Sequence, residues 1–185
     1  MSERILIDRG HGGSDPGAVG QVREVDITHA WGAAELENAL ARLGGDYYVL
    51  QDGANANSDL TVPVNESNRY GKPWLFVSLH ANAGGGTGYE TYIYTKSWSD
   101  PSTSNLGHTV HNAYGAVARK YGLANRGLKA EDFYVLRETQ RRAVLLKLGF
   151  VDNKKDADLM VKASYRTEAC KSFSKGFDAR GGANY

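Results

Sequence analysis

The sequence predicts a single α/β domain built on a mostly parallel, twisted sheet of about six strands, with helices on both faces. Short apolar runs of strand length alternate along the chain with segments of helical periodicity, which is typical of strand–helix–strand units. The length of 185 residues suits one domain with a sizeable core. The pattern contains no internal repeat and no sign of a second domain.

The first half of the chain supplies three of the expected strands. Residues 4–8 form a short apolar run that ends at a glycine-rich turn, which indicates a buried strand. Apolar residues at helical spacing then predict a long helix that ends at Gly44 and Gly45. Next, we expect a second strand at residues 47–50, a short helix at 64–70 and a third strand at 73–80.

The second half supplies the remaining strands and two further helices. Residues 88–94 alternate between polar and apolar types, as a half-exposed or edge strand does. A helix is predicted from residue 106 to 121, where Gly122 ends it. Next, we expect strands at residues 133–136 and 143–148 and a C-terminal helix at roughly 154–177.

Two histidines end two of the predicted strands. His11 follows the first strand among glycines, and His80 ends the third strand ahead of a second glycine cluster. Ligands of open α/β sheets bind at the carboxyl ends of the strands, and glycines let a metal or a substrate approach the backbone closely. An open catalytic zinc site uses three protein ligands. We expect Glu24 to be the third, because it opens the first helix and faces back toward the loop of His11.

Four stretches in this order resemble the zinc-dependent N-acetylmuramoyl-L-alanine amidases of the amidase-3 type, which occur among phage endolysins and bacterial autolysins. They are DRGHGGSDPGA at residues 8–18, EVD at 24–26, SLHAN at 78–82 and VLLKLGFVDN at 144–153. The resemblance implies a catalytic domain over residues 1–179 with a short tail at 180–185. It also implies that His11, Glu24 and His80 hold Zn²⁺. The expected reaction is hydrolysis of the amide between N-acetylmuramic acid and L-alanine in peptidoglycan.

Lys147 departs from the family pattern at the catalytic position. The family has a glutamate there, two residues before the Gly-Phe pair, and this carboxylate carries the proton from the water to the leaving amine. An ammonium has no lone pair, so we expect a catalytically impaired chain. Two other hypotheses remain open: Lys147 with a strongly lowered pKa, or a neighbouring carboxylate, Glu90 or Glu138. The cation should also lower metal affinity unless it turns away from the site.

Three further residues near the motifs have weaker predictions. Asp8 and Asn82 could orient the histidines, although a strand-end cap explains each of them equally well. Arg9 stands where the family usually has a small residue or proline. It could crowd the zinc loop or touch substrate carboxylates, but a solvent-facing arginine is the simpler interpretation. His108 and His111 share one helical face, which we interpret as a polar helix surface and not as a metal site.

Composition excludes several other classes of function. The net charge of +1 gives no general field for nucleic acid, and no run reaches the roughly 20 apolar residues of a membrane span. Cys170 is the single cysteine, which excludes both a disulfide framework and a cysteine zinc site. The first residues carry no export signal. We therefore expect a monomer that is made in the cytoplasm and acts on the cell wall after release.

Two alternative functions would use the same groups. One is a non-hydrolytic module that binds peptidoglycan through the same fold. The other is a zinc peptidase of the carboxypeptidase kind, against which the ordered motifs argue.

Overall fold

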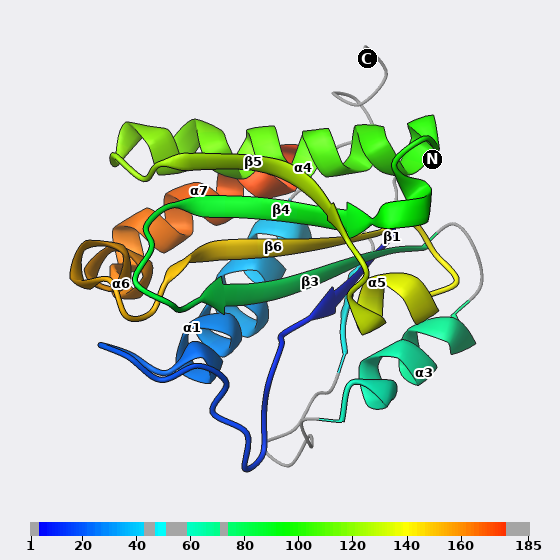
Figure 1. Cartoon of the computed structure of the whole chain (residues 1–185), viewed down its shortest axis with the longest axis horizontal. Coiled ribbons are helices and arrows are strands. Elements are labelled where there is room, and N and C mark those ends of the chain that lie inside the picture. The colour runs from blue at the N-terminus through cyan, green and yellow to red at the C-terminus, as the bar shows by residue number, and fades with distance from the viewer. Residues whose placement is uncertain (1–3, 43–46, 51–58, 71–73, 177–185) are drawn as a thin grey trace.

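A computed structural model describes residues 4–42, 47–50, 59–70 and 74–176. It confirms a single α/β domain with one six-stranded sheet in the order β2-β1-β3-β6-β4-β5 (Figure 1). All neighbouring strands are parallel except β4 and β6, which are antiparallel. The strands are β1 (Arg4–Asp8), β2 (Tyr47–Val49), β3 (Trp74–Asn82), β4 (Tyr89–Tyr94), β5 (Asn125–Glu131) and β6 (Ala143–Phe150).

The strand order places a ligand-binding position between β1 and β3. The chain leaves β1 for β2 on one side and then returns to β3 on the other side. In open α/β sheets, the crevice at the carboxyl ends of two such strands is where ligands bind. His11 follows β1 and His80 lies near the end of β3, so both predicted ligands belong to this position.

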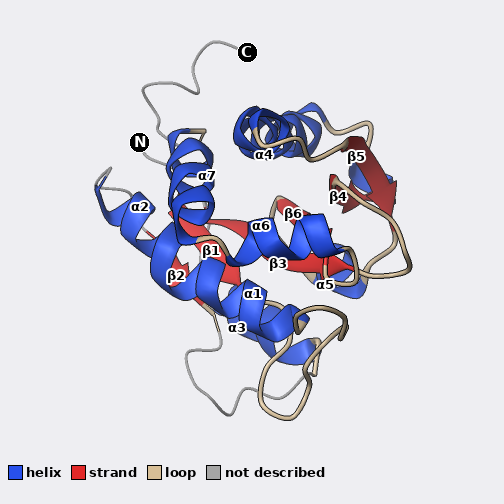
Figure 2. Cartoon of the chain, turned by 90° about the vertical axis from the view of Figure 1, so that its left-hand side faces the viewer, coloured by secondary structure: helices blue, strands red, loops and turns tan. Residues whose placement is uncertain are grey.

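Most helices pack on the first face of the sheet, where a large apolar cluster includes Val77, Tyr114 and Val144. These helices are α1 (Glu24–His29), a π-helical segment (Ala30–Leu36), α2 (Glu37–Arg42), α4 (Pro101–Lys120), α6 (Lys154–Val161) and α7 (Ala163–Lys175). Figure 2 shows α4 and α7 on the side of the sheet opposite α3.

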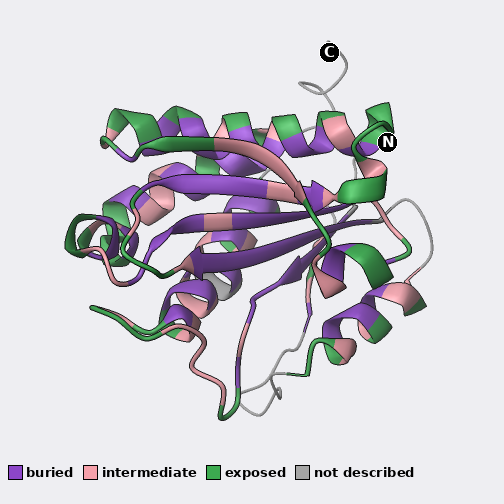
Figure 3. Cartoon of the chain, in the orientation of Figure 1, coloured by how far each residue is buried: buried purple, intermediate pink, exposed green. Residues whose placement is uncertain are grey.

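On the second face, α3 (Thr61–Arg69) and α5 (Tyr134–Glu138) cover a smaller cluster that includes Leu6, Phe76 and Leu145. The central strands are buried along most of their length (Figure 3). Helices therefore cover both faces, as predicted. Polar side chains, including Asp8, Ser78, His80, Lys147 and Glu90, continue the second face toward the carboxyl ends of β1, β3 and β6.

The fifth strand was predicted at the wrong place. Phe133 is the N-cap of helix α5, residues 134–136 lie in this helix, and the fifth strand is the polar segment Asn125–Glu131. Val135 and Leu136 are both buried in the second cluster, which neighbouring residues of a strand cannot be, because their side chains point to opposite faces. β5 lies at the edge of the sheet, so β4 is an interior strand, and four of its six residues are buried. The prediction of a half-exposed or edge strand is therefore wrong.

Two predicted helices are interrupted, and one helix has a buried histidine. The first helix passes through the π-helical segment, and the C-terminal helix divides at Lys162. His111 is 5% exposed, so its assignment to a polar helix surface is wrong. Thr91 Oγ1 and Asn125 Oδ1 lie 3.0 and 2.9 Å from its two ring nitrogens.

Among the described helices, none has the length and apolar character to cross a membrane. The predicted tail lies outside the described residues.

Candidate active site

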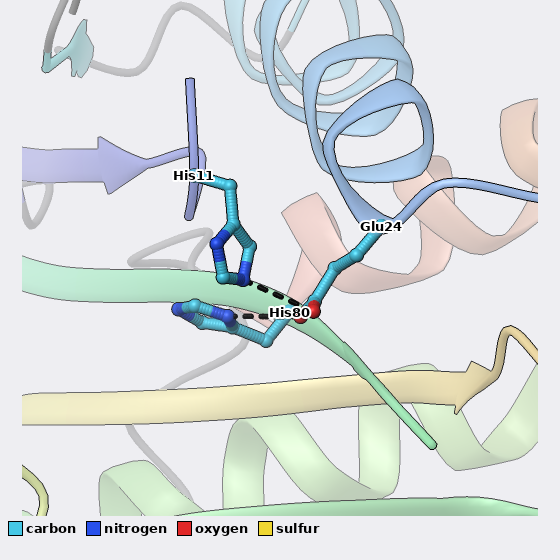
Figure 4. A group of neighbouring side chains, drawn as sticks. All are labelled: His11, Glu24 and His80. Carbon is cyan, nitrogen blue, oxygen red and sulfur yellow. Dashed lines mark hydrogen bonds and ion pairs between the residues drawn. The ribbon is translucent and has the colours of Figure 1, made fainter. Parts of the chain in front are cut away.

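His11, Glu24 and His80 converge from three separate segments of the chain. One possible ligand atom from each lies within 4.8 Å of the other two. His11 Nε2 is 3.0 Å from Glu24 Oε2, and His80 Nδ1 is 3.0 Å from Glu24 Oε1. Figure 4 shows the two imidazole rings and the carboxylate pointing toward one another. The structure therefore brings together the three residues that the sequence marked as metal ligands.

Two glycines leave room for the histidine rings, and Gly10 lets the segments of His11 and His80 approach each other. An added Cβ at Gly10 would lie 2.5 Å from His80 Cε1, and one at Gly17 would lie 2.6 Å from His11 Cδ2. Both distances are too short for any other residue without displacement of a ring. His11 itself has a φ of 69°, a backbone conformation that is uncommon outside glycine and that clusters at functional sites.

Backbone donors fix the carboxylate of Glu24. Ala18 N donates to Oε2 at 3.0 Å and Ala81 N donates to Oε1 at 2.7 Å. Burial would raise the pKa of Glu24, but contacts with His11 and His80 hold this pKa well below its usual value. Glu24 is therefore an anion whose two oxygens each face an imidazole.

Asp15 contacts His11, and sequence reasoning missed this contact. Its Oδ2 lies 2.7 Å from His11 Nδ1, and its Oδ1 accepts a hydrogen bond from Gly17 N at 2.9 Å. Histidine ligands of metals usually donate their second ring N–H to a carboxylate in this way. The signal in the sequence was an aspartate four residues after His11 in a glycine-rich loop.

The donor set fits a metal cation. His11 directs Nδ1–H to Asp15, so the lone pair of its Nε2 faces a carboxylate oxygen of Glu24. These two acceptor atoms are 3.0 Å apart, and they need a proton or a cation between them. Burial would lower the pKa of His11, but Glu24 and Asp15 outweigh burial and raise it. Burial lowers the pKa of His80, which favours the neutral form that binds metals.

Lys147 points into this group. Its position in β6 is the register partner of His80 in β3. Lys147 Nζ donates to Ala81 O at 2.9 Å and lies 3.7 Å from Glu24 Oε1. Burial lowers the pKa of Lys147, while Glu24 and Glu90 oppose that effect. The side chain of Lys147 therefore faces the predicted ligands and does not turn away from the site.

The two alternative carboxylates differ in position. Glu90 is the register partner of Lys147 in β4, whereas Glu138 ends α5, before β6 begins, and pairs with Arg137 at 2.7 Å. Glu90 accepts hydrogen bonds from Asn82 Nδ2 at 2.6 Å, from Arg126 Nε at 2.9 Å and from Lys129 Nζ. Burial would raise the pKa of Glu90, but these three donors lower it to about 2.

The weaker predictions have mixed outcomes. Asp8 accepts a hydrogen bond from Ser78 Oγ at 2.6 Å, and Asn82 donates to Glu90. Both contacts join neighbouring segments of the sheet, so a role in orienting the histidines stays a prediction. The solvent-facing interpretation of Arg9 is wrong: the residue is 8% exposed, and an added Cβ on Gly32 would lie 2.5 Å from Arg9 Cγ. Its aliphatic stem packs against the π-helical segment.

Comparison with known proteins gives consistent matches. Residues 5–179 match the amidase-3 family, described as N-acetylmuramoyl-L-alanine amidase. An endolysin of Bacillus phage SPP1 is 34% identical over 181 residues, which are 95% of this chain and 65% of the relative. A sporulation-specific N-acetylmuramoyl-L-alanine amidase of Bacillus subtilis is 34% identical over 182 residues, which are 95% of this chain and 67% of the relative. The chain thus spans about two thirds of the length of these relatives.

Solved structures have the same fold. The catalytic domain of CwlV, an N-acetylmuramoyl-L-alanine amidase from Bacillus (Paenibacillus) polymyxa, has a TM-score of 0.81 and 26% identity, covering 94% of this chain and 95% of that one. An amidase from Clostridium difficile 630 has a TM-score of 0.84, covering 100% of this chain and 99% of that one; its 23% identity supports the fold alone. The family match extends over nearly the whole domain, and the chain therefore belongs to the N-acetylmuramoyl-L-alanine amidase family of the amidase-3 type.

Proposed function

We propose that the chain is a zinc-dependent peptidoglycan amidase domain whose turnover is slowed by Lys147. The bond cut is the amide between N-acetylmuramic acid and L-alanine. The observation that carries the proposal is the convergence of His11, Glu24 and His80 within 4.8 Å, in a chain whose relatives are amidases and endolysins. The proposed place of action is the cell wall.

Each of the three ligands would contribute one atom to the ion. The geometry favours Nε2 of His11, a carboxylate oxygen of Glu24 and Nδ1 of His80. Two imidazoles and one carboxylate form a donor set that suits Zn²⁺ and leaves a position open. When bound there, zinc supplies a water activated near neutral pH and a Lewis acid for the substrate carbonyl. Asp15 would keep the ring of His11 in the orientation that exposes Nε2.

Lys147 cannot take the role of the proton acceptor while it is charged. Its Nζ is hydrogen-bonded to Ala81 O and faces Glu24, and the charge of Glu24 opposes the lowering of the Lys147 pKa by burial. Glu90 does not replace it, because three donors occupy its carboxylate and a pKa of about 2 makes it a weak base. Loss of general acid–base help predicts a rate about 10²–10⁴ times lower than that of a chain with glutamate at this position.

Hydrogen bonds occupy both the amine of Lys147 and the carboxylate of Glu90, so neither group is suited to accept a proton. This also favours a second candidate function, a non-hydrolytic peptidoglycan-binding module. The two functions differ in one product. Purified peptidoglycan is incubated with zinc and the chain, and newly exposed alanine amino termini are measured, with His80→Ala as the blank. Mass spectrometry of the fragments separates cleavage at the lactyl–alanine amide from cleavage of a peptide bond.

The proposed amidase requires slow release above the blank and much faster release by Lys147→Glu. Binding to peptidoglycan without release by either chain would support the binding module. Cleavage only within the peptide would support the zinc peptidase.

A further inference from the structure

Two cations of the edge strand lie beside the candidate active site, and the proposed chemistry leaves them unused. Arg126 and Lys129 extend from β5 and both bond Glu90 Oε2. Their side chains are 38% and 37% exposed, while that of Glu90 is 4% exposed. Each cation therefore has one side on a buried carboxylate and the other toward solvent. We call Arg126 and Lys129 the β5 cation pair.

The charges of this cluster do not balance. One carboxylate, Glu90, faces the β5 cation pair and is also the register partner of Lys147 in β6. Only one cation is needed to neutralise the buried anion, so positive charge remains on the exposed side. A low local dielectric and nearby like charges make such a surplus attractive for a further carboxylate.

The pair is also held in place before any ligand arrives. Arg126 bonds Glu90 through Nε, and its guanidinium lies 5.0 Å above the ring of Phe150. Lys129 Nζ bonds the same carboxylate and lies 5.7 Å from the ring centre of Tyr92. Arginine fixed in this way presents a planar fork for a carboxylate at a small loss of side-chain entropy.

The sheet sets the distance between this pair and the metal ligands. His80, Lys147 and Glu90 are register partners on the consecutive strands β3, β6 and β4, and β5 follows (Figure 1). Strands are spaced by about 4.8 Å, so Glu90, which both cations contact, lies roughly 10 Å from His80. An extended peptide covers about 3.3–3.6 Å per residue. A substrate cut at the metal would thus reach the pair with its second or third peptide residue.

We propose that Arg126 and Lys129 form a carboxylate-binding subsite for an acidic residue of the stem peptide, two to three residues beyond the amide that is cut. This inference rests on the proposed function, and it adds the part of the substrate that is recognised. Glu90 is then a positioning residue for the pair.

Calorimetry with soluble muramyl tripeptides tests the subsite in the unaltered chain. One pair of ligands carries at the second residue either a free carboxylate or its amide. The other pair carries at the third residue either diaminopimelate or lysine. In at least one pair, the ligand with the extra carboxylate should bind about fivefold to tenfold more tightly. The ratio of the two affinities should fall toward one in Arg126→Gln and in Lys129→Gln. It should stay unchanged in Lys154→Gln, which removes an exposed cation on α6.

Equal affinity within both ligand pairs would overturn the subsite, and this comparison needs no variant to fold. A preference that survives both substitutions in β5 would also overturn it. If no tripeptide binds and Lys147→Glu releases no alanine amino termini, the proposed function fails and the subsite with it. If Lys147→Glu hydrolyses peptidoglycan at the same rate whether or not the stem peptide carries the acidic residue, the proposed function stands and the subsite alone fails.

Discussion

Substitution of Lys147 by glutamate and by glutamine separates two effects of one residue. Under the proposed function, the cation both occupies the place of a proton acceptor and lies close to the predicted metal position. Glutamine removes the charge and keeps an N–H for the bond to Ala81 O. Glutamate reverses the charge and supplies a base. We expect Lys147→Gln to bind zinc more tightly without gaining activity, and Lys147→Glu to gain both.

The size of the metal effect follows from the distance to Glu24. Lys147 Nζ is 3.7 Å from Glu24 Oε1, and zinc lies about 2 Å from a carboxylate ligand, so Nζ and the ion would be ~4–5 Å apart. A single and a double positive charge at this distance repel by about 2 kcal/mol in water and by ~7 kcal/mol at an effective dielectric of 20. The side chain of Lys147 is 18% exposed, which places the effect between these limits. About 3 kcal/mol corresponds to a ~100-fold loss of zinc affinity.

Competition titration with a chromophoric chelator measures zinc affinity, and release of alanine amino termini from peptidoglycan measures activity. We expect the affinity to rise at least ~100-fold in both variants, and more in Lys147→Glu because its carboxylate also attracts the ion. The rate should rise by about 10²–10⁴ in Lys147→Glu alone. Equal zinc affinity in all three proteins would refute the repulsion argument. Equal hydrolysis by the unaltered chain and Lys147→Glu would refute the assignment of Lys147 as the impaired position.

Three further predictions concern the surroundings of the site. Asp15→Ala should lower zinc affinity about 10- to 100-fold in the same titration, because Nδ1 of His11 loses its partner; an unchanged affinity would show that the ring is held by other contacts. The pKa of Glu90 is lowered to about 2 from its ordinary value of 4.5. Its ion pairs therefore stabilise the fold fully above pH 4.5, and this stabilisation is lost as the pH falls toward 2. Between pH 5 and 2, the free energy of unfolding should therefore fall by about 1–2 kcal/mol more in the unaltered chain than in Glu90→Gln, allowing for screening by its half-exposed partners; parallel curves would contradict this. The carboxylate of Asp156 accepts from Thr87 Oγ1, Gly88 N and Phe150 N, so Asp156→Ala should cost ~3 kcal/mol in urea denaturation. The exposed Asp158→Ala on the same helix should cost under about 0.5 kcal/mol, and similar values for the two would contradict the argument.

The candidate ligands could be predicted because their signals are local. His11 and His80 each end an apolar strand among glycines, and strand order then brings the two strand ends together. Glu24 needed the family pattern as well, since an acidic first-turn residue is common in helices. Asp15 acts through a contact of only four residues along the chain, yet an aspartate in a glycine-rich loop is equally typical of an ordinary turn.

The fifth strand and the β5 cation pair could not be predicted, and the reason is the same for both. The segment Asn125–Glu131 has no apolar run, because it is an edge strand with much of its length exposed. Its pairing with β4 depends on the sheet edge that β4 offers, which the sequence of the segment does not encode locally. The sequence does not determine the orientation of Lys147 for a similar reason. It depends on the carbonyl of Ala81, which lies where the register of β3 and β6 shifts between His80 and Asn82.

We expect Lys147 to change how the stability of the fold depends on metal as well. Its ammonium lies between two carboxylates, with Glu24 Oε1 at 3.7 Å on one side and Glu90 as its cross-strand partner on the other. If the proposed metal binds beside Glu24, the cation in this position neutralises part of the negative charge that the metal would otherwise neutralise. Lys147→Glu instead places a third carboxylate between these two, and like charges at such positions destabilise the metal-free fold.

The metal-free form of Lys147→Glu should therefore melt at a lower temperature than the unaltered chain, and zinc should restore its stability. A ~100-fold tighter site adds up to about 2.7 kcal/mol of stabilisation at saturating zinc, which corresponds to roughly 5–10 °C in Tm for a domain of this size. Thermal melts with zinc and with a chelator measure the difference for each protein. An equal response of both proteins to zinc would show that Lys147 does not act as an internal counter-ion, even if it blocks proton transfer.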